Sequence, residues 1–122
     1  MNNRNCKVRN KKAFKSFKEV ILKELNNGAL IINIQYTCMF GFYEGLLASV
    51  DNSVIVTDKT NVKYNIKNGI KAFFCETIRE ENELLDDILE SIKMLKVNAK
   101  SGKLESIEIK KLYNLKIEIL KA

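Results

Sequence analysis

The sequence contains no histidine, no proline and no tryptophan. Without histidine the chain has no imidazole general base, no Ser–His or Cys–His couple, and none of the side chain common to most zinc sites. It also has no phosphate-binding loop, dinucleotide-binding, serine-hydrolase or zinc-protease motif. The closest pairs of carboxylates, such as Asp86 and Asp87, fall on the expected solvent side of a helix. We therefore expect no enzyme activity, no catalytic residues, no metal site and no cofactor.

Cysteine is scarce, and long apolar runs are missing. The three cysteines are Cys6, Cys38 and Cys75, and no two of them have CxxC spacing. An odd number of cysteines without CxxC spacing predicts free thiols in a reducing compartment. The longest apolar stretch, 29–50, is interrupted by polar residues and glycine, and the basic N-terminal segment has no apolar stretch after it. We therefore expect a cytoplasmic protein without a membrane partner.

What the chain does have is a globular composition with an uneven distribution of charge. Its 122 residues are 46% hydrophobic and 30% charged, which suits one domain. Of the net charge of +6, residues 1–23 hold eight basic residues against one acidic, and residues 76–91 hold seven acidic against one basic. Basic ends can neutralise phosphates. The alternative is a solvated surface with charges matched to helix dipoles, or lysine enrichment through AT-rich codons.

The hydrophobic pattern changes its period along the chain. Residues 1–12 are polar and basic and predict a disordered arm. Apolar residues at helical spacing predict a helix over 13–25, ended by Asn-Asn-Gly. From residue 29 onward, alternation predicts five short strands separated by turns, the last being Ile70–Cys75 after a tight turn at Asn68-Gly69. Gly45, inside the second strand, indicates sharp curvature or a close approach of backbone.

The rest of the chain predicts one more helix and a C-terminal extension. Thr77 and Glu80 have the spacing of a capping box before a helix over 78–98, with acids early and lysines late. Residues 104–122 favour a β-hairpin turning at 111–114, with a helix as the alternative. The predicted fold class is α+β in a single domain, 13–122. It comprises an N-terminal helix, a small five-stranded antiparallel SH3-like barrel with its core over 29–76, a second amphipathic helix and the C-terminal hairpin.

Residues 43–51 follow the pattern apolar-x-Gly-x-apolar-x-x-apolar-Asp, and residues 66–70 include the tight turn before the last predicted strand. In these features the segment 13–77 resembles the Sm/Hfq-like barrel family, whose second strand has that pattern and whose turn between the last two strands can be laid over 66–70. Asn68 stands where that turn has a histidine, Ile66 where it has a tyrosine, and Ser53 where the signature has an asparagine. The last 45 residues have no counterpart. The strand at 44–48 and the later Tyr64 are also similar to the Veg family of small Gram-positive proteins.

The resemblance implies an RNA-binding homo-oligomer with a pore lined by two loops, here Asp51 and Asn52 in one and Lys67 and Asn68 in the other. The residues themselves add two groups. The basic arm can grip phosphates, and Tyr64 beside Lys63 can stack a base. The candidate nucleic-acid-binding residues are therefore Arg4, Lys7, Arg9, Lys11, Lys12, Asp51, Asn52, Lys63, Tyr64, Lys67 and Asn68.

Two hypotheses for function follow. The first is a non-enzymatic regulatory module that binds nucleic acid, RNA ahead of DNA. The second is a small protein-interaction or inhibitor module of the kind mobile elements encode, for example against a host defence nuclease. Such a module would have a protein partner and no nucleic-acid affinity of its own. Salt-dependent binding of nucleic acid would separate the two.

Overall fold

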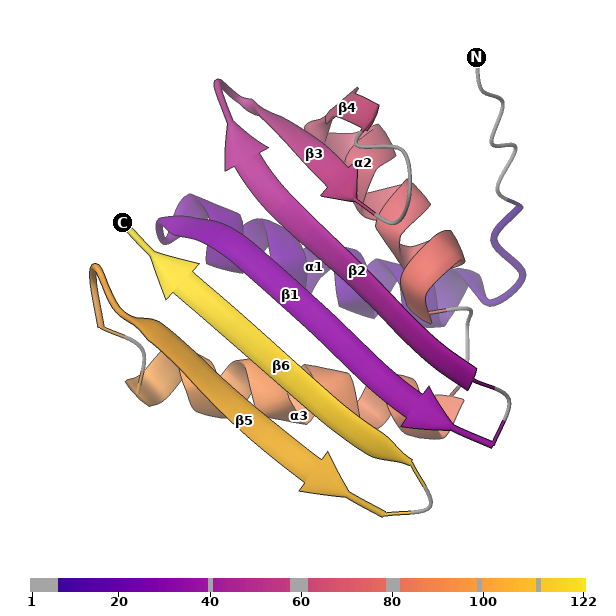
Figure 1. The fold of residues 1–122 in the computed structure, drawn as a ribbon. Helices are drawn as coiled ribbons and strands as arrows, with labels where there is room; N and C mark the ends of the chain where they lie inside the picture. The colour runs from indigo at the N-terminus through magenta and orange to yellow at the C-terminus, as the bar shows by residue number, and fades with distance from the viewer. Residues whose placement is uncertain (1–6, 40, 58–61, 79–81, 99, 112) are drawn as a thin grey trace.

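The computed structural model describes residues 7–39, 41–57, 62–78, 82–98, 100–111 and 113–122. Within them the chain has an α+β fold in which helices lie on one side of an antiparallel sheet (Figure 1). The order of elements is α1 (Lys11–Asn26), β1 (Ala29–Cys38), β2 (Gly41–Val50), β3 (Ser53–Thr57), β4 (Val62–Asn65), α2 (Ile66–Phe73), a π-helical turn (Phe74–Ile78), α3 (Asn82–Asn98), β5 (Leu104–Lys110) and β6 (Asn114–Lys121).

The predicted first helix is confirmed, with an earlier start. Asn10 caps it, because the Asn10 side chain accepts a 3.0 Å hydrogen bond from the Ala13 N–H. Lys11 and Lys12, assigned to the arm from sequence, are therefore in the first turn of α1. Residues 1–6 of the predicted arm lie outside the described residues. The apolar side of α1 is buried, with Phe17 and Ile21 fully covered.

Four of the five predicted strands are confirmed as an antiparallel meander, β1 to β4. The turn between β2 and β3 consists of Asp51 and Asn52, whose φ values are 47° and 61°. Two successive residues with positive φ form the turn type that matches the twist of a hairpin, and Asp and Asn tolerate that conformation.

The prediction of a fifth strand at Ile70–Cys75 is wrong, because this segment is helical. Asn65 caps α2 by accepting a 2.9 Å hydrogen bond from the Asn68 N–H, so Asn68 and Gly69 are helical rather than a tight turn. Ile70, Phe73 and Phe74 are completely buried, at spacings of three and four residues that place them on one helical face. An apolar run this short fits either period, and packing against both α1 and the sheet selects the helix.

The sheet is open, and its strand order is β4-β3-β2-β1-β6-β5. The C-terminal hairpin is confirmed, so the helical alternative for 104–122 is excluded. The second strand of this hairpin, β6, pairs with β1. It occupies the edge of β1 that another strand would have to pair with if the sheet were to close into a barrel. The structure therefore shows the predicted α+β class but does not confirm the five-stranded barrel.

The helix predicted over 78–98 is confirmed as α3, which begins at Asn82. Thr77 lies in the π-helical turn, so the predicted capping box is not the start of α3. α3 is tied to the hairpin end of the sheet. Asp87 accepts hydrogen bonds from the Tyr113 hydroxyl and, at 3.1 Å, from the Lys111 ammonium.

The prediction of three free thiols is wrong for Cys75, which is disulfide-bonded, whereas Cys38 is a free thiol. Cys6 lies outside the described residues. Among the helices of the described ranges, none is both long and apolar enough to span a bilayer. The cytoplasmic location inferred from the cysteines stays a prediction.

Candidate binding surfaces

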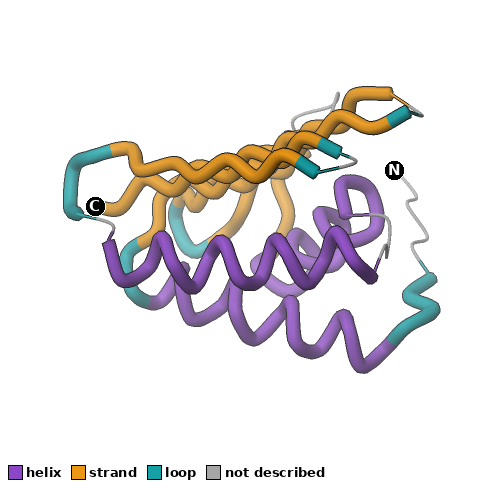
Figure 2. Tube along the Cα trace, turned by 90° about the horizontal axis from the view of Figure 1, so that it is seen from below, coloured by secondary structure: helices purple, strands orange, loops and turns teal. Residues whose placement is uncertain are grey.

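The two faces of the sheet are covered differently. Figure 2 shows the helices together on one face, where the core lies between α1, α2, α3 and the sheet. The rings of Phe14 and Phe17 on α1 lie 5.2 and 5.3 Å from that of Phe74, and these contacts join α1 to the π-helical turn. No described helix covers the other face of the sheet, which we call the open face. Side chains on each face can meet a partner.

On the helical side, the solvent-facing surface of α1 is a ridge of positive charge. We call it the basic ridge, and it consists of Lys11, Lys12, Lys15, Lys18 and Lys23. Four of these side chains are exposed; Lys18 is half-buried, with its ammonium 5.7 Å from the centre of the Phe14 ring. Within the described part of the chain, none of the five is in an ion pair. Glu19 is the single acid among them.

Lys11 and Lys12 are unfavourable for the helix itself, whereas Lys23 is in the last turn of α1, where a cation is favourable. Backbone dipoles make the N-terminal end of a helix positive, so acidic side chains stabilise the first turn and lysines destabilise it. α1 has no acid in its first turn, and Lys11 and Lys12 are both there. Dipole matching, offered above as an alternative for the charge blocks, accounts for the acids early in α3 but not for α1. At the start of α1 the lysines and the helix dipole therefore add to one positive potential.

The start of α1 borders a hollow of about 300 Å³ against α3. Its lining includes Lys12 and Ser16 from α1 and Asp86 and Leu89 from α3. Asp86 is exposed and lies on the α3 side of the hollow. The acidic start of α3 thus borders the basic ridge on one flank, at Lys12.

The two loops that the Sm/Hfq resemblance assigned to a pore do lie side by side. Ser53 of β3 pairs with Asn65 of β4, so the Asp51–Asn52 turn is next to the start of α2. Lys67 and Asn68, however, are exposed residues of the first turn of α2 rather than of a loop between strands. The loop expected there is therefore a helix N-terminus.

The remaining predicted residues are dispersed. Lys7 and Arg9 are exposed just before α1, and Arg4 lies outside the described residues. Lys63 is exposed on the open face, opposite Ile55 of β3. Tyr64 points the other way, where its half-buried ring packs against the core. The position of Tyr64 therefore does not support the prediction that its ring stacks a base.

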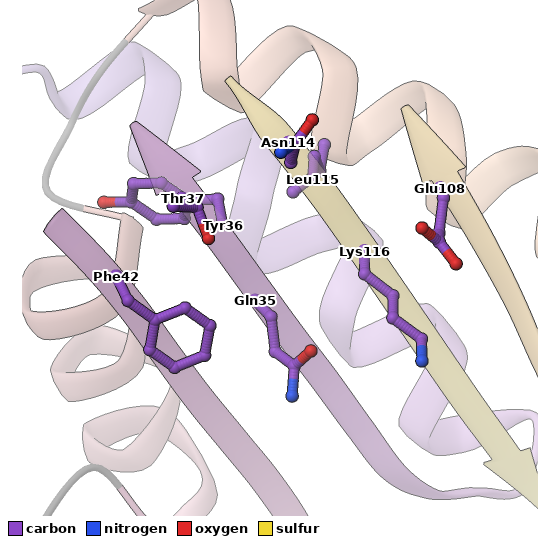
Figure 3. Close-up of a pocket in the computed structure, with 8 residues that line it drawn as sticks. All are labelled: Gln35, Tyr36, Thr37, Phe42, Glu108, Asn114, Leu115 and Lys116. Atoms are coloured by element: carbon purple, nitrogen blue, oxygen red, sulfur yellow. The ribbon is translucent and has the colours of Figure 1, made fainter. Parts of the chain in front are cut away.

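The open face carries a shallow hollow near the β1–β2 and β5–β6 turns. Figure 3 shows Phe42, Gln35, Lys116 and Glu108 projecting there from four different strands, and the hollow has a volume of about 170 Å³. Gln35 donates a hydrogen bond to Glu44, and Lys116 lies 3.8 Å from Glu118. The carboxylates would repel phosphates, so this hollow does not suit a polyanion.

Sequence reasoning counted the positive charge up to residue 23 but missed Lys15, Lys18 and Lys23 as candidate binding residues, and it missed the whole open face. The first had a signal in the spacing of Lys11, Lys15 and Lys18, which is the i, i+4, i+7 spacing of one helical face. The second had none, because β6 reaches β1 only in the tertiary fold.

The described residues contain no cluster of acids and cysteines that could hold a metal ion. No family model matches the chain, and no curated protein or solved structure matches it either.

Proposed function

We propose that this chain is a non-enzymatic module that binds nucleic acid through the basic ridge of α1, with RNA as the expected polymer. The observation that carries the proposal is the accumulation of lysines in the first turns of α1, where they work against helix stability. A phosphate backbone would reverse that disadvantage, because each neutralised phosphate releases condensed counterions and favours binding. Lys7 and Arg9 extend the same charge beyond the helix.

The preference for RNA rests on the resemblance to the Sm/Hfq-like family. A pore would need Lys67 and Asn68 in a loop between strands, and both are in the first turn of α2. We therefore assign the phosphate contacts to α1, and a barrel-type ring is not needed for them.

The test is fluorescence anisotropy with labelled single-stranded RNA and DNA of the same sequence, across a salt series. The key variant replaces Lys11, Lys12 and Lys15 with glutamine. Its matched control replaces Lys93, Lys100 and Lys103, which are three exposed lysines far along the chain. Both variants lose three charges, so total charge is held equal between them.

We expect the ridge variant to bind at least about tenfold more weakly than the native chain, and its salt slope to fall by about 2, since each single-strand phosphate contributes roughly 0.7. The control should lose little affinity. Equal losses in both variants would mean that binding follows net charge alone, which contradicts the assignment to α1. No binding at low salt would reject the function and favour the protein-interaction hypothesis.

A further inference from the structure

The open face carries a continuous apolar row that no described element covers. Cross-strand pairing places five side chains in line from β3 to β5: Ile55, Ala48, Ile31, Leu120 and Leu104. Leu104 is 56% exposed, and Leu30 and Val50 beside the row are 41% and 39% exposed. Isolated surface leucines need no explanation, but a contiguous row across a sheet is typical of an interaction surface.

The charge on this face differs from that of the whole chain. Its acids are Glu44, Glu108 and Glu118, and its bases are Lys63, Lys110 and Lys116, so the face is neutral although the chain carries +6. The polar groups are also arranged in short complementary sets, such as Asn33, whose amide donates a 2.9 Å hydrogen bond to Glu118. A neutral face with an apolar row meets a second copy of itself without net repulsion.

We propose that the open face is the interface of a homodimer, with a two-fold axis running along β1. Facing sheets pack about 10 Å apart with their strands nearly aligned. Rotation about β1 sets β2 against the partner's β6, and β3 against its β5. The register then brings Ala48 opposite Leu120 of the partner subunit. It also brings Ile55 opposite the partner's Leu104.

The charges on the open face favour a two-fold axis along β1 over one that runs between β1 and β6. With the axis along β1, Glu44 faces Lys116 of the partner subunit, because both pair with Gln35 in their own sheet. The symmetry makes this ion pair twice. An axis one half-strand away, between β1 and β6, would instead set Glu44 against the partner's Glu108, which pairs like charges.

The area of the open face suits a dimer of low affinity. Five strands about 4.8 Å apart and seven residues rising about 3.3 Å each give an area of roughly 550 Å² in projection. A standard stable interface buries about 800 Å² per partner. We therefore expect a reversible dimer with a dissociation constant in the micromolar range.

The experiment is sedimentation velocity of the native chain over a hundredfold concentration range, alongside Leu104→Asp and a control, Met94→Asp. Met94 is 55% exposed and lies on α3, on the helical side, so the two changes insert the same charge at equally exposed apolar positions. We expect Leu104→Asp to weaken the dimer at least tenfold and Met94→Asp to leave it unchanged. Circular dichroism confirms that each variant is folded.

A charge exchange tests the axis. Glu44→Lys alone and Lys116→Glu alone should each weaken the dimer, and the double variant should recover most of the loss, since the two exchanged charges would again attract each other across the interface. A native chain that stays monomeric up to millimolar concentration would overturn the proposal, as would a dimer insensitive to Leu104→Asp. Failure of the double variant to recover would overturn the axis. If Leu104→Asp reduced nucleic-acid affinity with no change of mass, the face would be a nucleic-acid surface instead.

Discussion

At the scale of single residues, two contacts hold elements together in ways that one substitution can disturb. The first is the contact between Gly45 of β2 and Thr77 of the π-helical turn. A β-carbon added at Gly45 would lie 2.0 Å from Thr77 Oγ1 and 2.6 Å from Thr77 Cγ2. The sequence predicted sharp curvature or a close approach of backbone at Gly45. The structure shows a close approach, but of the Thr77 side chain, and it brings the turn directly onto the sheet.

We predict that Gly45→Ala lowers the free energy of unfolding by about 1–3 kcal/mol, the usual cost of overpacking a core. Urea denaturation measures it. Thr77→Ala removes the two closest atoms, so the double variant should lose less stability than the sum of the single variants. Simple additivity would show that the two residues do not contact each other.

The second contact is the cluster around Asp87. The hydrogen bond from Tyr113 and the hydrogen bond and charge of Lys111 lower the pKa of Asp87 below its usual value, against partial burial. A carboxyl group whose pKa is lowered on folding stabilises the native state above its unfolded pKa of about 3.9. That contribution is lost as pH falls through the lower, native pKa.

Tyr113→Phe should therefore raise the pKa of Asp87, which carboxyl NMR titration can follow. It should also reduce stability at pH 7 by about 1 kcal/mol, as expected for one lost hydrogen bond. At a pH below the native pKa of Asp87, where the carboxyl group is protonated in both states, the pKa-linked part of this loss should vanish. A loss of equal size at that pH and at pH 7 would mean that Tyr113 acts through packing alone.

At the scale of the elements, α1 and α3 place their charges in opposite ways. α3 has acids such as Asp86 in its early turns and Lys93 near its end, which its dipole favours. α1 has lysines in its first turn, which its dipole disfavours. Stability alone accounts for the charges of α3 but not for the lysines at the start of α1, which is why the proposed phosphate contacts are assigned to α1.

We predict that replacing Lys11, Lys12 and Lys15 with glutamine stabilises the protein by about 1 kcal/mol at low salt, given 0.3–1 kcal/mol for each charge near a helix end. Thermal unfolding measures it. The control change Lys93→Gln, near the favourable end of α3, should be neutral or slightly destabilising. Loss of stability in the triple variant would mean that these lysines have a structural role, and weaker nucleic-acid binding would then need another explanation.

At the scale of the whole molecule, the two faces have different chemistry. The helical side has the basic ridge, and the open face is neutral with an apolar row. A dimer formed through the open face would leave both ridges on its outer surfaces, so the two proposals need no shared residue. They also respond differently to salt, because phosphate binding is electrostatic and apolar burial is not.

We therefore predict that a fourfold rise in salt lowers nucleic-acid affinity by about 50-fold if four phosphates are neutralised. Anisotropy titrations supply this value. Over the same range the dimer dissociation constant should change by less than about threefold, because only the Glu44–Lys116 pairs are screened. A dimer that dissociates as steeply as the nucleic-acid complex would show that charge rather than the apolar row joins the subunits.

By itself, the sequence determined the elements whose periodicity is unambiguous: α1, the strands β1 to β4 and α3. In each of these, neighbours within a few residues decide which face is apolar, so the local pattern is sufficient. It also determined the turn at Asp51–Asn52 and the close approach at Gly45, since both depend on residue types with special backbone freedom. For residues 104–122 the sequence favoured a hairpin but left a helix open, and the pairing of β5 with β6 decided between them.

Only the tertiary structure decided the helical state of residues 70–75 and the order of the strands. The run from Ile70 to Cys75 is apolar apart from Lys71, so either period fits it until α1 and the sheet supply the surfaces that select the helix. The open sheet arises because β6 pairs with β1 although the paired residues are 77 to 92 positions apart in the chain. A contact so distant leaves no local periodicity, and the open face with its neutral charge exists only once that pairing is made.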